Sequence, residues 1–412
     1  VPVGLIIDDS TCLVNLNRFA MPQFDTAFNR KRGPYQRRWK EWPLEIPDSF
    51  VRKFGEWCGE NGVKGKYSIV PFPACVGRLD LEVPGWTRRE IKDSIKLVQD
   101  VMMPNWDIHP EMVTHTRVID LKTGHPFPEI SPKTMENAAF TTGRSADEIA
   151  AYQAYALQIL KNIDLPCEGI TTPGGYGKDA LPQLAQASLD SVRDVFQAEV
   201  PHYFRHLYTD DHSVVPRVEL ASGLDTHDPK CVVSVIGCTG DWTGGWDNSD
   251  PVGADKFISA DLKTGRMVDV ITKGEPAMMV CHWTGIHWSG QEKGFKVFQE
   301  VVRRLHSRFD NLIWMKLSEL SRYWAAKELT RIESTSEGIT LRAPFACPGF
   351  TLQCKTRNST PPKIKSAGKQ VALRSIGLLR DLEPGTCHHS LDTLTVCFDL
   401  IKGNQIIEMI GS

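Results

Sequence analysis

The feature that most constrains the fold is a regular alternation of apolar runs and amphipathic stretches over residues 1–330. Apolar runs such as "VGLIIDD" and "GKYSIVPFP" predict buried strands. "TRREIKDSIKLVQDVM" and "SADEIAAYQAYALQILKNI" have apolar residues at helical spacing, and the second begins with a capping box from Ser145 to Glu148. Strands that alternate with helices imply a parallel sheet with right-handed crossovers. Six or seven such units favour a closed or nearly closed α/β barrel, with an open doubly wound sheet as the alternative.

The pattern changes after Arg331. Short strand-like segments, among them "GITLRAPFACPGFTLQC" and "TLTVCFDLI", are separated by Gly, Pro and Asn, and no helical period appears. These segments predict a small all-β, sandwich-like domain. We therefore expect an α/β barrel that carries the active site over residues 1–330, followed by a C-terminal β domain over residues 334–412.

Charge and hydropathy bear on the partners of the protein. The formal net charge is −2, so we expect no strong attraction to nucleic acid. No apolar run approaches the ~20 residues that a membrane-spanning helix needs, so we expect no membrane partner. The chain opens almost directly with a predicted strand, which is compatible with a processed or trimmed N-terminus.

Eleven cysteines are present, and none forms a C-x-x-C pair, which argues against a structural zinc site of the usual spacing. Four of them lie near the C-terminus and could pair if the protein is exported, namely Cys347, Cys354, Cys387 and Cys397. The cysteines alone do not decide the compartment. We favour export, to a periplasm or to the outside, over the cytoplasm.

Polar residues follow several of the predicted strands. Asp8 and Asp9 end the first strand, His115 ends a middle strand, and His282 ends the late strand "AMMVCHW". The carboxyl ends of the strands in an α/β barrel meet on one rim, where the chemistry takes place. Each residue also has a structural interpretation, because Asp-Asp pairs cap helices and single histidines are often only hydrogen-bonded. Together they favour a divalent metal ion held by carboxylate and imidazole groups.

Further candidates fall in loops at the same strand ends. "TTPGGYG" follows a strand, and "GDWTGGWDNSD" and "CHWTG" place tryptophans in loops. Loop tryptophans often stack on sugar faces, and they can equally plug the mouth of a barrel. The substrate-binding candidates are Thr172, Pro173, Asp241, Trp242, Trp246 and Trp283.

Four of these segments resemble the motifs of one family and occur in the family's order. "LIIDDST" looks like the Asp-Asp motif of the polysaccharide deacetylase superfamily, the NodB-like carbohydrate esterases, and "EMVTHT" looks like its second motif. "GITTPGGYG" is similar to the third motif, and "MMVCHW" is similar to the late strand that ends in His. The resemblance spans roughly residues 1–330, although only the short motifs carry it.

The resemblance implies a distorted (β/α)7 barrel and a metal-dependent hydrolase that removes acetyl groups from a carbohydrate. In that pattern Asp8 is the general base and His282 is the general acid. Asp9 and His115 are ligands of the divalent ion, zinc or a similar metal, which polarises the acetyl carbonyl and activates a water.

The sequence departs from the family's pattern at two places. The second motif of the family carries another His four residues after the first, and Ile119 stands there in this chain. Asp120 is the nearest carboxylate for a third metal ligand, with His109 or His125 as the imidazole alternatives. The third motif of the family carries an Arg that steadies the base, and threonines stand near that place here.

Two other functions stay open on the residues alone. A glycoside hydrolase on a similar barrel needs two carboxylates on either side of the scissile bond, ~5 to 9 Å apart. Asp8 or Asp9 together with Asp241 or Asp247 could serve. A non-catalytic glycan-binding protein would use the tryptophan loops as its surface. Metal dependence separates the deacetylase from the glycoside hydrolase, and turnover separates both from the binding protein.

Overall fold

The computed structural model describes residues 1–28, 39–335, 338–356, 360–366 and 369–409. Contacts within the chain divide it into two compact units. The first unit contains Val1–Leu220 and Val232–Ser318, and the second contains Ala221–Cys231 and Glu319–Ser412. The main boundary between the units therefore lies at Ser318, whereas the change of sequence pattern lies after Arg331.

The first unit contains a parallel sheet around β1 (Pro2–Asp8). This strand pairs on one side with β10 (Ala277–His282) and on the other with β2 (Gly65–Ser68), which pairs in turn with β3 (Trp106–His109). The short β11 (Ile313–Trp314) pairs with the start of β1. β1 is buried along almost its whole length, as expected of an apolar run in a parallel sheet that is covered on both faces.

A second sheet has the strand order β6-β7-β9-β8. Its strands are β6 (Gly169–Thr171), β7 (His202–Leu207), β8 (Arg217–Ser222) and β9 (Lys230–Gly237). In the sequence, β4 (Ile119–Asp120) and β5 (His125–Pro126) lie between β3 and β6, and they form a short antiparallel pair. The alternation of strands and helices along the first unit confirms the predicted mixed α/β architecture.

Two backbone hydrogen bonds connect the two sheets. Thr171 N donates to the carbonyl of Pro110 at 3.0 Å, and Cys238 N donates to the carbonyl of Met278 at 2.7 Å. Over the described residues of the first unit, the strands other than β4 and β5 form two separate sheets and not one continuous closed sheet. The predicted closure of a barrel is therefore not seen as a continuous ladder of hydrogen bonds.

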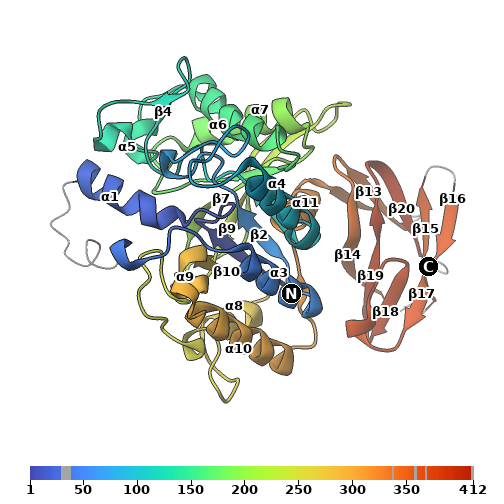
Figure 1. Ribbon diagram of the computed structural model, residues 1–412. Helices are drawn as coiled ribbons and strands as arrows, with labels where there is room; N and C mark the ends of the chain where they lie inside the picture. Colours follow the sequence, from blue (N-terminus) through green and yellow to red (C-terminus); the bar gives the residue numbers. More distant parts are fainter. Residues whose placement is uncertain (29–38, 336–337, 357–359, 367–368, 410–412) are drawn as a thin grey trace. The chain divides into compact units, whose positions relative to one another are not determined.

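Helices connect the strands of the first unit (Figure 1). Thr87 and Glu90 form a capping box at the start of α4, and Ser145 and Glu148 form the predicted capping box at the start of α6. Among the described residues, the α-helices that lie wholly in the first unit are α1 (Leu16–Phe28), α3 (Asp48–Glu60), α4 (Arg88–Leu97), α5 (Ala138–Thr141), α6 (Ala146–Lys161), α7 (Leu181–Phe196), α8 (Arg266–Thr272), α9 (Trp283–His287) and α10 (Lys293–Arg308). The next helix, α11 (Leu317–Leu329), contains the boundary between the two units.

An aromatic core packs against β1 and β2. Trp283 is 1% exposed, and its ring centroid lies 5.2 Å from that of Phe54 in α3 and 5.3 Å from that of Tyr67 in β2. Phe295 of α10 packs on Phe54 with the ring centroids 5.2 Å apart. Interiors are close-packed, so this core fixes where the neighbouring strands end.

The second unit contains two β-sheets that share a core. The sheets have the orders β12-β13-β20-β15-β16 and β14-β19-β18-β17. Leu341 and Ile407 of the first sheet belong to the same buried cluster as Phe350 and Val396 of the second. The strands are β12 (Arg331–Thr335), β13 (Gly338–Ala343), β14 (Cys347–Lys355), β15 (Lys363–Ser366), β16 (Lys369–Ala372), β17 (Arg374–Ile376), β18 (Thr386–Ser390), β19 (Thr393–Leu400) and β20 (Gly403–Glu408). This arrangement confirms the predicted C-terminal β-rich region.

All eleven cysteines lie among the described residues, and all are free thiols, including the four near the C-terminus. Burial raises the pKa of Cys12 and of Cys238 to about 12, so neither forms a thiolate at neutral pH. Within the described parts of the chain, no helix combines the length and the apolar character needed to cross a membrane.

Candidate active site

The parallel strands bring the predicted chemical residues to one edge of the first unit. Asp8, the last residue of β1, lies in register with His282, the last residue of β10. A cavity of about 420 Å³ adjoins these strand ends. Its lining includes Asp8, Asp9, Glu111, His115, Glu136, Thr172, Pro173, Trp246 and His282.

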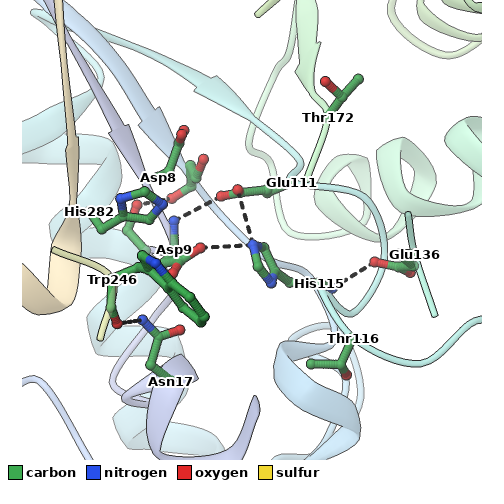
Figure 2. Close-up of polar contacts among 12 residues, drawn as sticks. Asp8, Asp9, Asn17, Glu111, His115, Thr116, Glu136, Thr172, Trp246 and His282 are labelled. Atoms are coloured by element: carbon green, nitrogen blue, oxygen red, sulfur yellow. Dashed lines mark hydrogen bonds and ion pairs between the residues drawn. The ribbon is translucent and has the colours of Figure 1, made fainter. Parts of the chain in front are cut away.

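Asp9, Glu111 and His115 form a compact group in which one imidazole faces two carboxylates (Figure 2). We call this group the rim cluster. His115 Nε2 lies 2.8 Å from Asp9 Oδ1 and 3.2 Å from Glu111 Oε1. The other oxygen of Glu111 accepts a hydrogen bond from the backbone N–H of Asp9 at 2.8 Å. One possible ligand atom from each residue lies within 4.8 Å of the other two.

The backbone at two residues of the rim cluster is strained. Asp9 has a φ of 61° and His115 has a φ of 63°, in the left-handed region that residues with a Cβ seldom adopt. Such conformations cost about 1–3 kcal/mol each and persist only where the surrounding structure enforces them. Both strained residues direct their side chains toward the same point, which is a pattern typical of functional sites.

Glu136 anchors the loop that carries His115. Its carboxylate accepts hydrogen bonds from the backbone N–H of His115 at 2.7 Å and of Thr114 at 3.0 Å. The hydroxyl of Tyr152 donates to the same carboxylate at 2.5 Å. Burial raises the pKa of Glu136 to about 7, against the opposing effect of these hydrogen bonds. Glu136 is therefore a positioning residue for His115.

A buried ion pair holds Asp8. Lys66 of β2 is 0% exposed, and its ammonium group pairs with the Asp8 carboxylate. The same Nζ donates to the carbonyl of Ile7 at 2.9 Å and to Ser68 Oγ at 2.8 Å. Burial raises the pKa of Asp8 to about 6, an effect that Lys66 opposes and that the nearby Glu111 reinforces. A carboxyl with this pKa can accept and return a proton near neutral pH.

The charges of the rim cluster depend on one another. Burial, the largest single effect, would raise the pKa of Asp9 and of Glu111. The adjacent His115, together with His282 at Asp9 and Lys66 at Glu111, outweighs burial and lowers the pKa of both carboxyls. Burial would lower the pKa of His115, but the two carboxylates outweigh it and raise the pKa well above the ordinary value. With no other cation between them, the three side chains hold two negative charges and one positive charge.

Asp241 orients His282 at the end of β10. His282 Nδ1 lies 2.8 Å from Asp241 Oδ2, and the other oxygen of Asp241 accepts the backbone N–H of His282 at 3.3 Å. Burial would lower the pKa of His282, but Asp241 and Asp9 outweigh it and raise the pKa to about 10. His282 is therefore protonated near neutral pH, and its Nδ1 is engaged by a carboxylate.

Trp246 is the predicted tryptophan that reaches the cavity (Figure 2). Its ring stands edge-on to that of Phe24, with the centroids 6.2 Å apart, and its carbonyl accepts a hydrogen bond from Asn17 Nδ2 at 2.6 Å. The Phe24 ring also stands edge-on to His115 at 6.0 Å. Phe24 and Trp246 therefore form an aromatic wall beside the rim cluster.

Three predicted substrate-binding residues, Asp241, Trp242 and Trp283, are not among the residues that line the cavity. Trp283 belongs to the aromatic core around Tyr67. Trp242 is 8% exposed and packs on Phe257, with the ring centroids 5.1 Å apart. Asp241 contacts His282, as described above. The structure thus gives these three residues packing or orienting contacts, whereas Thr172, Pro173 and Trp246 line the cavity.

The carboxylate that completes the rim cluster is Glu111, which is none of the third ligands expected from the sequence. Asp120 accepts a backbone N–H at 3.0 Å within its own turn. His125 is exposed in the short β4–β5 pair. His109 is buried, and its Nε2 lies 2.9 Å from Nε2 of His202. The structure therefore does not bring Asp120, His109 or His125 to the cavity.

Sequence reasoning missed three residues that the structure places at the site. Glu111 stands four residues before His115 in "EMVTH", so a search on both sides of the histidine would have found it. Lys66 is a single cation in the apolar run "GKYSIV", which signals a buried partner. Glu136 carries no comparable signal, because its partners are mainly backbone N–H groups of a loop distant in the sequence.

No family model matches the chain, and no curated protein matches it. Similar solved structures include an Anoxybacillus α-amylase, with 9% identity and a TM-score of 0.34, over 100% of this chain and 98% of that chain. A Parabacteroides distasonis protein provisionally described as a glycoside hydrolase/deacetylase has 12% identity and a TM-score of 0.39, over 95% and 86%. Thermotoga maritima α-fucosidase has 10% identity and a TM-score of 0.34, over 99% and 94%. At these values the likeness carries no conclusion, so the function is inferred from the site.

Proposed function

We propose that this chain is a metal-dependent hydrolase of the polysaccharide deacetylase type, which removes an acetyl group from a carbohydrate. The observation that carries the proposal is the rim cluster: two carboxylates and one imidazole converge on one point beside a cavity. Asp8, whose pKa lies near neutrality, and the protonated His282 end neighbouring strands beside this cluster. The site therefore combines a candidate metal centre with a candidate base and a candidate acid.

A distorted seven-stranded barrel is part of this proposal. Followed through their contacts, the strands β10, β1, β2, β3, β6, β7 and β9 return to β10. Single hydrogen bonds at Thr171 and Cys238 make the two connections between the sheets. A ring of strands whose hydrogen-bond ladder is interrupted at two places supports a distorted barrel of the NodB type. In such a barrel the carboxyl ends of all strands face one rim.

The donor atoms of the rim cluster fit a divalent ion. Two carboxylate oxygens and one imidazole nitrogen form a ligand set that zinc and similar metals accept, with positions left for water and substrate. His115 lies between the two carboxylates, which raise its pKa well above the ordinary value, so this point favours positive charge. Asp9, Glu111 and His115 would hold the ion. When bound, such an ion polarises the acetyl carbonyl and lowers the pKa of a coordinated water.

Side chains of the protein perform the proton transfers and hold the sugar. Asp8 accepts a proton from the attacking water, while Lys66 fixes the position of its carboxylate. His282 donates from Nε2 to the leaving nitrogen or oxygen of the sugar, because its Nδ1 is held by Asp241. The indole face of Trp246 at the cavity offers a surface on which a sugar ring can stack.

Release of acetate from acetylated oligosaccharides tests the proposal. We expect the full chain to release acetate, to lose this activity when a chelator removes the ion, and to regain it with Zn²⁺. Asp8→Asn should stop acetate release while the ion still binds. Asp120→Asn is the matched control, because the Asp120 carboxylate accepts a hydrogen bond within its own turn and does not line the cavity, and it should keep the activity. Undiminished acetate release by protein shown to be free of metal would overturn the proposal.

A glycoside hydrolase is the second candidate, and the electrostatics of two carboxyls favour it. Burial raises the pKa of Asp8 to about 6, whereas the contact with His115 lowers the pKa of Glu111. Glycoside hydrolases pair a protonated carboxyl with an ionised one, as acid and as base or nucleophile. Cleavage of aryl glycosides by chelator-treated protein, without release of acetate, would select this candidate.

A further inference from the structure

A second group of histidine and carboxylate side chains lies within the strands of the first unit. His109 ends β3, His202 begins β7, both are 0% exposed, and their Nε2 atoms are 2.9 Å apart. Asp107 stands two residues before His109 on β3, and its Oδ2 lies 3.9 Å from His202 Nε2. We call these three residues the interior cluster. None of these three described residues lines the cavity of the rim cluster.

We propose that the interior cluster binds a structural divalent transition-metal ion, Zn²⁺ or one of similar ligand preference, through Asp107, His109 and His202. Imidazole nitrogens and a carboxylate oxygen are ligands that zinc prefers. A tetrahedral ion at ~2.0–2.1 Å from each donor keeps the donors roughly 3.3 Å apart. The separations of 2.9 Å and 3.9 Å lie on either side of this value, so small side-chain rotations accommodate the ion.

Gly169 of β6 leaves space for the His202 side chain to approach His109. Gly169 of β6 is paired with His202, and a Cβ at Gly169 would lie 2.7 Å from His202 Nε2. Gly169 has no left-handed φ, so its backbone conformation suits any residue. The same Cβ would lie 2.6 Å from the backbone carbonyl oxygen of His202. The glycine therefore supplies space for both the backbone and the imidazole of His202, and any other residue would displace His202.

The ligands of the interior cluster have the outer partners that metal ligands usually have. Asp107 accepts hydrogen bonds from the backbone N–H of Ser318 at 2.6 Å and from its hydroxyl at 2.8 Å. His109 Nδ1 lies 3.4 Å from Thr171 Oγ1, on the side of the ring away from His202. Such contacts fix the orientation of a ligand, and the Asp107 oxygen that faces His202 is the one that accepts the Ser318 N–H.

The distance between the two imidazoles also suits metal ligands. At 2.9 Å, at least one of the two Nε2 atoms must present a lone pair and not a proton, so at least one ring is in the neutral form that binds metals. The three side chains supply three of the four ligands of a tetrahedral ion, and a water would complete the set. Burial of both histidines on the strands closes this fourth position to a substrate.

The test counts the metal in the full chain after the rim cluster has been disabled by Asp9→Asn together with His115→Gln. Each variant is produced in zinc-supplemented medium and purified without chelator, and the zinc per chain is measured by mass spectrometry. We expect one equivalent in this double variant and none after the further change His202→Gln. His206→Gln, on the same strand, is the matched control and should keep the equivalent.

A second variant and a second probe avoid the loss of a ligand. Gly169→Ala keeps all three ligands but displaces the His202 ring, so its zinc content should fall well below one equivalent. Production in cobalt-supplemented medium should give the double variant the visible absorption of tetrahedral Co²⁺. A double variant that is folded by circular dichroism and carries neither zinc nor cobalt overturns the proposal, as does full occupancy after Gly169→Ala. Since the count is made without a working rim cluster, it does not depend on the hydrolase activity.

Discussion

The rim cluster and the interior cluster contain the same kinds of side chain in different settings. The rim cluster lies in loops that follow the strands, two of its residues have left-handed backbones, and it borders a cavity. The interior cluster lies on β3 and β7 themselves, and both of its histidines are fully buried. An open, strained site suits a reaction, whereas a closed site on regular strands suits the fold. The comparison teaches that backbone conformation and burial decide the function of each cluster, because the ligand types alone are nearly the same.

The two clusters also differ in what holds them. Glu136 holds the His115 loop through backbone N–H groups, so the position of His115 depends on this buried carboxylate. The hydrogen-bonded ladder from β6 to β7 places His202, and Ser318 holds Asp107. Substitutions should therefore affect activity at the rim and stability in the interior.

The largest expected effect comes from a ligand of the rim cluster. Asp9→Asn removes one of the two negative charges that face His115, so the ion should no longer bind there. We expect acetate release to fall by at least roughly 10³-fold, as for the loss of a group that stabilises the transition state. Acetate assays and zinc content would measure both changes. Asp247→Asn is the control, because Asp247 contacts its own loop through Ser249 N at 3.2 Å.

The second effect concerns His282 and depends on the leaving group. His282→Gln removes the imidazolium that Asp241 stabilises, and general acids contribute about 10²–10⁴-fold. Release of acetate from an N-acetyl sugar should fall by this factor, because a sugar amine needs a proton to leave. Hydrolysis of an activated aryl acetate should change little. Equal losses on the two substrates would show that His282 only packs at the strand end.

Much of the fold could be predicted from the sequence because the signals are local. The alternation of apolar runs and amphipathic stretches indicates strands and helices directly, and the capping box at Ser145 and Glu148 is present. The pairing of Asp8 with His282 follows once β1 and β10 are neighbours in a parallel sheet. The sequence predicts a closed or nearly closed barrel, but the described strands of the first unit form separate sheets, which single hydrogen bonds such as that of Thr171 connect. No local pattern in the sequence reports where a ladder of hydrogen bonds is interrupted.

The site could be predicted only in part because distant contacts complete it. The left-handed backbones at Asp9 and His115 turn the chain so that Glu111, and not Asp120, faces the histidine. No pattern of spacing reports such a turn. Trp283 shows the same limit, since a tryptophan next to a strand end can point to the cavity or to the core, and packing decides between them.

A smaller effect is expected from Glu136, which touches His115 only through the backbone. Glu136→Gln removes the charge of the carboxylate that accepts the His115 N–H, so the ligand should be less well positioned. We expect the affinity of the rim cluster for Zn²⁺ to fall by about 10–100-fold, as for other groups that orient ligands. The zinc of the interior cluster should stay in place. Competition with a metal indicator measures the affinity, and the exposed Glu129→Gln is the control.

The smallest effect is the release of a proton on metal binding. This release should distinguish the two clusters, because their histidines differ in charge. In the metal-free protein the carboxylates of Asp9 and Glu111 raise the pKa of His115 well above its ordinary value, so its imidazole is protonated at pH 7. A metal ion takes only the neutral ring, so binding at the rim must release about one proton. The affinity should therefore increase with pH until the pH passes the pKa of His115.

Calorimetric titration with Zn²⁺ in two buffers of different ionisation enthalpy measures this proton. The proton release should disappear in the variant with Asp9→Asn and His115→Gln, which keeps the interior cluster. In that cluster His109 needs no deprotonation, because burial and the neighbouring His202 lower its pKa well below the ordinary value. Zinc binding at the rim that is independent of pH between 6 and 8 would mean that His115 is already neutral, and the two clusters would then not differ in charge.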